Sequence, residues 1–202
     1  MTGVRNKIAA SVLCGLIFSV LLGMTGFNAE CEGIRQSVFR VHIIANSDSQ
    51  TDQQLKLTVR NRLLVLSDNL FAECKNEEQA IKLARENIDL FRDEAKKTIQ
   101  QQGFDYPVKV TVDKAYFDTR VYEGFTLPAG KYDALKVVIG SGRGKNWWCV
   151  MFPAVCVPAA TDTDISDALD KRQSGIVKNP TRYRLGFKTV EIYEQLKELL
   201  KG

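Results

Sequence analysis

The chain has 202 residues, of which 45% are hydrophobic and 26% are charged. This balance excludes an intrinsically disordered chain and allows one well-packed core, so a single folded domain is expected. The formal net charge of +4 falls to +2 without Arg5 and Lys7, because 28 basic residues less these two leave 26 against 24 acidic ones. Nucleic-acid binding normally needs a concentrated basic face, so no nucleic-acid partner is expected.

The N-terminal segment has the features of an export signal. Arg5 and Lys7 precede an uncharged stretch, Ile8 to Phe27, which is long enough to cross a hydrocarbon core of about 30 Å as a helix. We therefore expect residues 1–29 to be a signal peptide or membrane anchor, and residues 30–202 to form one extracytoplasmic domain. Cleavage stays open, because a bulky residue stands where a small one is preferred, and a buried core helix is the alternative.

The next residues predict one strand and two helices. Residues 36–46 are rich in β-branched and aromatic side chains, which is typical of a strand. Apolar residues then recur at steps of four and three and predict a helix from about 51 to 71. A second helix is expected from the capping box at 76–79 as far as Gly103.

The second half of the chain changes to a pattern of strands. Apolar and polar residues alternate over 108–117, and further strands are expected near 132–139 and 147–152, in an antiparallel meander. Residues 159–180 predict a loop, and residues 182–200 begin extended and end as a short helix. This order predicts an α+β fold in which an N-terminal export helix precedes an antiparallel-rich sheet with helices packed on one face.

Few residues could support catalysis. The chain has a single histidine, so a nucleophilic scheme must use His42. An exported hydrolase acting on cell-wall material through His42 and Asp48 is the enzymatic alternative, while the other interpretation is a structural histidine on a partly buried strand face. The turn Gly140 to Lys145 fails as a phosphate loop, because Asn146 stands where serine or threonine is needed. One histidine and no Cys-x-x-Cys pair predict neither a metal site nor a cofactor.

Cysteines and tryptophans cluster late in the chain. Four cysteines lie beyond the export segment, namely Cys31, Cys74, Cys149 and Cys156. They allow three pairings, and Cys149 with Cys156 is favoured because the two are close in sequence and flank a proline. Trp147 and Trp148 are adjacent, so on a strand only one of them can enter the core. The other is either covered by a loop or is an exposed anchor for a partner.

Two segments, Phe39 to Leu64 and Leu127 to Cys156, resemble the stage II sporulation protein R family of secreted signalling proteins from endospore-forming bacteria. The shared motifs are Ile-Ala-Asn-Ser-Asp-Ser, the Asp-Gln and Leu-Lys-Leu helix start, Ala-Gly-x-Tyr-x-Ala-Leu and Asn-Trp-Trp-Cys-Val-x-Phe-Pro. The chain departs from the family at Lys145, where a histidine is expected, and at Ala154, where the second proline of a pair is expected.

The resemblance implies an exported activator that is made in the forespore and acts in the space between two membranes. Its partner would be a membrane-embedded aspartic protease of the mother cell, stage II sporulation protein GA, which then cleaves the sigma E precursor. The family member is a ligand of this protease, so no enzymatic activity is expected.

The partner contacts that we expect lie in two loops. The first is the Trp-Trp-Cys loop, with Asn146, Trp147, Trp148 and Phe152, in which a disulfide between Cys149 and Cys156 would lower the ordering cost of binding. The second contains Asn46, Asp48 and Asp52. An alternative for the second loop is that its residues only turn the strand and cap the following helix.

Overall fold

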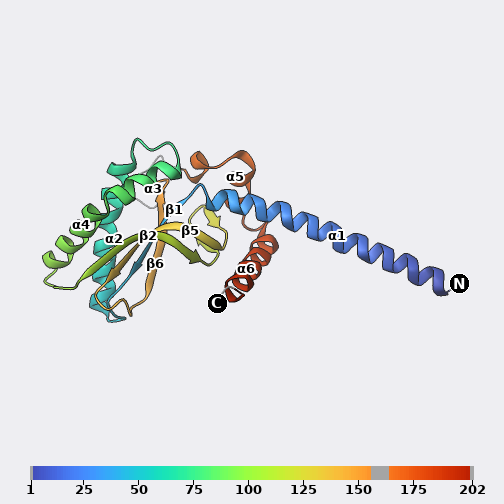
Figure 1. The fold of residues 1–202 in the computed structure, drawn as a ribbon, viewed down its shortest axis with the longest axis horizontal. Helices are drawn as coiled ribbons and strands as arrows, with labels where there is room; N and C mark the ends of the chain where they lie inside the picture. Colours follow the sequence, from blue (N-terminus) through green and yellow to red (C-terminus); the bar gives the residue numbers. More distant parts are fainter. Residues whose placement is uncertain (1, 156–163, 201–202) are drawn as a thin grey trace.

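The computed structural model describes residues 2–155 and 164–200. Its centre is a sheet of four strands, which are β1 (Phe39–Ile44), β2 (Val108–Phe117), β5 (Gly130–Ile139) and β6 (Asn146–Phe152). The strands lie in the order β2-β5-β1-β6 (Figure 1). β1 pairs with β5 in parallel, and the other two pairings are antiparallel. The predicted α+β class with a mostly antiparallel sheet is confirmed.

The predicted meander is wrong, because β5 and β6 do not pair with each other. Both pair with β1, which lies between them. β1 has buried residues at its first five positions, and a strand that is buried on both faces belongs in the middle of a sheet. The turn after β5 therefore carries the chain past the end of β1 instead of folding it back on itself.

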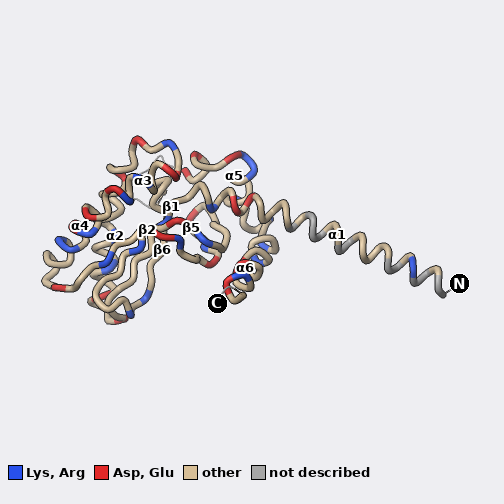
Figure 2. Tube along the Cα trace, viewed as in Figure 1, with Lys and Arg blue, Asp and Glu red and all other residues tan. Residues whose placement is uncertain are grey.

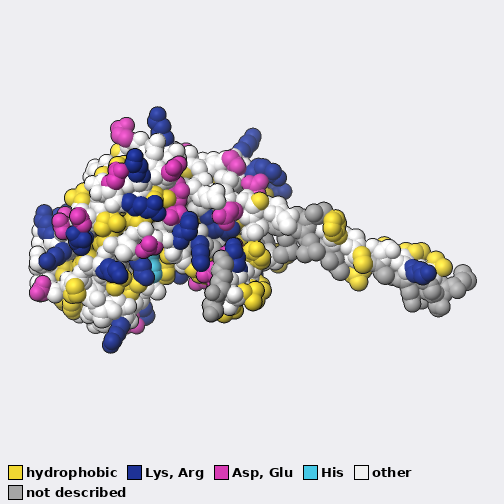
Figure 3. All heavy atoms as spheres, in the orientation of Figure 1, with side chains coloured by type: hydrophobic (Ala, Val, Ile, Leu, Met, Phe, Trp, Pro, Cys, Tyr) yellow, Lys and Arg dark blue, Asp and Glu magenta, His cyan; other side chains and the backbone are white. Residues whose placement is uncertain are grey.

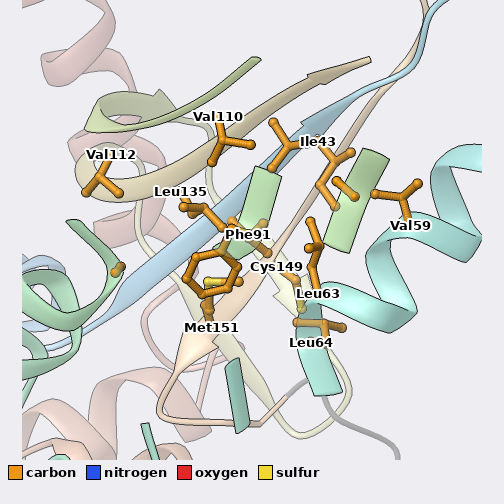
Figure 4. Close-up of a cluster of buried hydrophobic side chains, with 14 of the residues drawn as sticks. Ile43, Val59, Leu63, Leu64, Phe91, Val110, Val112, Leu135, Cys149 and Met151 are labelled. Carbon is orange, nitrogen blue, oxygen red and sulfur yellow. The ribbon is translucent and has the colours of Figure 1, made fainter. Parts of the chain in front are cut away.

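Three helices cover one face of the sheet, which are α2 (Gln50–Phe71), α3 (Glu77–Glu86) and α4 (Ile88–Gln101). Between them and the strands lies the main hydrophobic core. Figure 4 shows ten labelled members of this core: Ile43, Val59, Leu63, Leu64, Phe91, Val110, Val112, Leu135, Cys149 and Met151. Full burial of each aliphatic side chain is worth about 1.5–3 kcal/mol, so this layer supplies most of the driving force for folding.

The second predicted helix is two helices, with a break at Asn87. Its backbone has φ −115° and ψ 24°, and both its N–H and its side-chain Nδ2 donate to the carbonyl oxygen of Leu83, at 3.0 and 2.9 Å. An asparagine side chain that bonds the local backbone competes with helix continuation. The apolar spacing runs on through the break, so periodicity alone gave no sign of it.

The N-terminal helix α1 (Thr2–Arg35) is continuous, and its first part projects from the body (Figure 1). Charged residues are spread over the body, whereas few of the residues that Figure 2 colours in the projecting part are charged. Hydrophobic side chains are exposed along it instead (Figure 3): Val4, Ile8, Val12, Leu13 and Phe18. Within the described ranges, no helix meets the length and hydropathy needed to span a bilayer.

The last turns of α1 pack into the body. Ile34 and Val38 join a second hydrophobic cluster on the other side of the sheet. This cluster also receives the hairpin of β3 (Arg120–Tyr122) and β4 (Phe125–Leu127), and the helices α5 (Lys171–Lys178) and α6 (Arg184–Leu199). These elements cover one end of the second sheet face. The predicted boundary between residues 29 and 30 lies inside α1, and it stays a prediction.

Arg35 ties the end of α1 to two distant segments. Its guanidinium contacts Glu32 at 2.7 Å and Glu194 of α6 at 3.6 Å, and its Nη1 donates to the carbonyl oxygen of Ala129 at 2.8 Å. Arg35 and Glu194 are both buried. The last turn of α1, the segment before β5 and α6 are therefore held at one point.

The region from 159 to 200 differs from its prediction. Residues 159–163 lie outside the described part of the chain, but the rest of the predicted loop contains a 3-10 turn (Ile165–Ala168) and α5. α5 starts with a capping box between Asp170 and Gln173, and eight residues are too few to establish a clear period. The expected extended start of the last segment is also wrong, because α6 is helical from Arg184.

Candidate partner-binding site

The loop after β1 (residues 45–52) and the glycine-rich turn before β6 (residues 140–145) are docked on each other. We call these two segments together the polar corner. Arg143 and Ser141 donate to the Asn46 carbonyl oxygen at 3.1 and 2.7 Å, and the Lys145 N–H donates to the Asp48 carboxylate at 2.6 Å. Hydrogen bonds therefore join two segments that are almost 100 residues apart in the sequence, and the shape of the corner depends on both segments.

Asp52 is the buried centre of the first segment. Its carboxylate accepts from Asn46 Nδ2 at 2.9 Å and from Ser47 Oγ at 2.5 Å, while its N–H donates to the helix cap Ser49. Burial alone raises the pKa of Asp52, but these hydrogen bonds outweigh it and lower that pKa below its ordinary value. The side chains of Asn46 and Asp52 therefore stabilise the conformation of the loop. This agrees with the alternative in which the loop residues only turn the strand and cap the following helix.

The turn contains glycines for two different reasons. Gly140 and Gly142 have φ of +59° and +62°, a backbone conformation that favours glycine. Gly144 has an ordinary φ but no room: a Cβ there would lie 2.2 Å from the Ser47 carbonyl oxygen. The close approach of the two segments therefore depends on the missing side chain of Gly144.

Trp147 and Trp148 lie on opposite faces of the edge strand β6, as the alternation of a strand predicts. Trp147 packs against the main core, with the guanidinium of Arg60 of α2 at 4.9 Å from its ring centroid. Trp148 lies on the other face, stacked on His42 at 3.5 Å with an angle of 15° between the rings. Both indoles are half-buried, so each is covered on one side and presents the other to solvent.

His42 is a buried, neutral member of this second face. Its Nε2 bonds the Asn146 side-chain oxygen at 2.9 Å. Burial, opposed by the Asn146 hydrogen bond and assisted by the nearby charge of Lys136, lowers its pKa to about 4. In the described part of the chain no hydrogen bond joins His42 to Asp48, whose carboxylate is bound to the turn. A base with this pKa and without that partner gives the hydrolase alternative no support.

The depressed pKa of His42 predicts a pH effect on stability. Between pH 6.5 and about 4 the unfolded chain binds the proton and the folded chain does not, so the contribution of a neutral His42 is complete above pH 6.5 and is lost as pH falls. We expect the stability difference between the wild type and His42→Gln to shrink by about 2 kcal/mol from pH 7 to pH 5, measured by urea unfolding.

The quantity to compare between pH values is the stability difference between the wild type and His42→Gln, because the pH dependence of wild-type stability also contains the effects of other groups. Burial, reinforced by the charge of Asp133, raises the pKa of Glu77 to about 7, so Glu77 stabilises the fold as pH falls and acts against His42. Glu77 is present in both proteins, and its effect cancels between them. A stability difference that does not change with pH would contradict the assignment of a buried neutral histidine.

Arg40 lies behind the histidine on the same face and is fully buried. Its guanidinium lies 3.9 Å from the ring centroid of Phe117 and 4.7 Å from that of Tyr132, and it donates to the hydroxyl of Tyr122. Among the described residues it has no carboxylate partner. Cation–π contacts replace the usual ion pair here, so the second face has a positive charge under its aromatic layer.

The structure brings together only part of the predicted site. Asn146, Trp147 and Trp148 begin β6 beside the polar corner, whereas Phe152 ends the strand and lines a pocket of about 250 Å³ with Phe71 and Cys74. A strand of seven residues separates its ends by about 20 Å. Phe152 and the polar corner are therefore separate surfaces.

The predicted disulfide stays a prediction, because Cys156 lies outside the described residues. Its expected partner Cys149 is buried in the main core. Cys31 and Cys74 are free thiols in this structure, and burial raises the pKa of Cys31 to about 12, although the Arg35 charge opposes the rise. Cys31 is therefore a core residue with little thiolate character.

Comparison with known proteins identifies the family. The model of the family described as stage II sporulation protein R matches residues 35–162. A Bacillus subtilis (strain 168) protein named stage II sporulation protein R is 32% identical over 155 residues, which cover 72% of this chain and 69% of the relative. The chain belongs to the stage II sporulation protein R family. No solved structure matches it significantly.

The stage II sporulation protein R match covers the whole sheet, helices α2 to α4 and both segments of the polar corner. α6 lies outside the matched region. The two departures from the family motifs are Lys145, whose contacts in the polar corner are made by backbone atoms, and Ala154, which is only partly buried against the main core. Lys145 serves the corner through its N–H and its carbonyl oxygen, which accepts from Lys56 Nζ at 2.9 Å, so these bonds do not depend on which side chain stands there.

Proposed function

We propose that this chain is the exported activating ligand of the membrane-embedded aspartic protease of the mother cell, stage II sporulation protein GA. It is made in the forespore, exported through its N-terminal segment into the space between the two membranes, and binds the extracytoplasmic part of the protease. The protease then cleaves the sigma E precursor. In this role the chain is not an enzyme. Membership of the family supports a role in sporulation.

One observation carries the choice of contact surface. The two segments with the family motifs are far apart in sequence, yet their most polar parts meet in the polar corner, and Trp147 and Trp148 follow directly. A ligand shifts a protease toward its active arrangement only if it binds that arrangement more tightly. A cross-linked surface binds with less loss of conformational entropy than a mobile loop, which favours the corner and its flanking indoles as the contact.

The test is reconstitution in a host without the sporulation programme. The chain, the protease and the sigma precursor are coexpressed, and cleavage of the precursor is followed with and without residues 1–29. Cleavage that requires both the chain and its export segment is the expected result. Absence of cleavage, with the chain folded and exported and the protease competent with a known activator, would overturn the proposal.

The same assay tests the contact surface. Trp147→Ala and Trp148→Ala are expected to weaken binding to the protease by on the order of 2 kcal/mol for the indole that is the anchor. Because each ring is half-buried, the stability of both variants is measured in parallel. Two folded variants that both activate fully would show that the partner binds elsewhere.

A further inference from the structure

The second face of the sheet holds a cleft that shares only Trp148 with the proposed contact surface. Its volume is about 440 Å³. The lining comes from all four strands: His42 of β1, Lys136 and Val138 of β5, Trp148 of β6, and Lys109, Thr111, Asp113, Lys114, Ala115 and Tyr116 of β2. The hairpin and α5 and α6 cover the other end of this face, so the cleft is the part of the sheet face that no described element covers.

The floor of the cleft is a row of side chains across the sheet. The strand register places Thr111 opposite Lys136, Lys136 beside His42, and His42 opposite Trp148. Neighbouring strands are about 4.8 Å apart, so these four positions span roughly 14 Å. An extended peptide rises about 3.3 Å per residue. The row is therefore matched to three or four peptide residues and is too long for a single small anion.

The chemistry of the row changes along its length. At one end the half-buried Trp148 ring lines the cleft, with the His42 ring stacked against it. The other end has a positive net charge, since Lys109 and Lys136 have no acidic partner among the described residues and face one carboxylate in the lining, Asp113, whereas Lys114 is neutralised by Asp133 at 2.6 Å. Figure 3 shows the histidine among lysine and arginine side chains on this face.

The histidine also has unused hydrogen-bonding capacity. Its Nδ1 has no partner within the described residues, although the side chain is only 7% exposed. This nitrogen is covered by the protein, so it is not itself a ligand contact. The contacts that the cleft offers are the Trp148 ring and the two unpaired cations, Lys109 and Lys136.

We propose that this cleft binds a short, extended, acidic segment of a partner protein. Its carboxylates pair with Lys109 and Lys136, and an adjacent side chain packs against Trp148. This proposal does not rest on the proposed function, because the two surfaces share only Trp148 and the cleft is tested with a peptide and without the protease. Charge complementarity selects an acidic segment over a basic or neutral one.

The experiment uses the purified chain and a capped peptide, acetyl-Gly-Glu-Glu-Glu-Glu-Gly-amide, with the lysine peptide of the same length as the matched probe. Trp147→Phe removes the indole on the opposite face, so that Trp148 reports binding by its fluorescence. We expect saturable binding of the glutamate peptide alone. It should weaken on raising salt from about 0.05 to about 0.3 M, because the contacts are ionic.

The double variant Lys109→Gln/Lys136→Gln is expected to weaken binding by about tenfold or more, equivalent to about 1.4 kcal/mol. The matched control is Lys96→Gln/Lys97→Gln, which removes two exposed charges from α4 and should leave binding unchanged. Equal loss in both double variants would show a general charge effect and overturn the site. So would a lack of saturable binding, or binding to phosphatidylglycerol vesicles and not to the peptide, which would assign the face to a membrane surface.

Discussion

Replacing Arg35 by methionine is expected to lower the free energy of unfolding by about 3–5 kcal/mol. The change keeps much of the side-chain volume but leaves Glu194 buried with Lys197, at 3.6 Å, as its one cationic neighbour among the described residues. It also removes the donor to the Ala129 carbonyl oxygen. Loss of one member of a buried ion pair is costly because the other keeps its desolvation penalty. Urea unfolding of the full chain measures the effect.

Arg172→Met is the matched control for this change. Arg172 also pairs with a glutamate of α1, Glu30 at 3.3 Å, but its side chain is 84% exposed against 3% for Arg35. An exposed pair contributes about 0–1 kcal/mol, so Arg172→Met should lower stability by less than about 1 kcal/mol. Similar losses in the two variants would show that α1 is not fixed to the body at Arg35.

Gly144→Ala is expected to cost about 1–3 kcal/mol of stability and to abolish or strongly reduce activation in the coexpression assay. The new methyl group would lie 2.2 Å from the carbonyl oxygen and 2.6 Å from the carbonyl carbon of Ser47. Both are backbone atoms, so one segment of the polar corner must move away from the other. The hydrogen bond from Gly144 to the Ala45 carbonyl oxygen, now 2.9 Å, is then strained or lost.

The control is the same substitution at a glycine without neighbours. Gly175 lies inside α5, and a Cβ there would meet nothing within 4 Å. Alanine is preferred in a helix by about 1 kcal/mol, so Gly175→Ala should be neutral or stabilising. A Gly144→Ala protein that is as stable as the wild type and activates normally would show that tight docking of the two segments is not required.

Local features of the fold were predictable from the sequence. The helix expected at about 51–71 is α2, Gln50–Phe71, because its apolar stripe and cap are encoded within a few residues. Val41 and Ile43 lie on one face of β1 and Arg40 and His42 on the other, as the alternation of a strand requires. Strand order was not predictable, because the neighbours of β1 are chosen by pairing across more than 90 residues.

In the candidate site, too, local features were predictable from the sequence and contacts between distant segments were not. The opposite directions of Trp147 and Trp148 come from strand geometry and were predicted, but their covers, Arg60 and His42, come from distant elements. The positive φ of Gly140 was foreseeable from a glycine-rich turn. The role of Gly144 was not, because the loop that it contacts is almost 100 residues earlier in the chain.

The position of β1 in the middle of the sheet also sets the order in which the protein can fold. β1 is among the first parts of the body to be synthesised, but one neighbour, β5, starts at Gly130 and the other, β6, ends at Phe152. The sheet therefore cannot close until three quarters of the chain exist, and such long-range pairing is slow. This delay is consistent with the proposed export, because a chain whose sheet has not yet closed is still unfolded while most of it is being made.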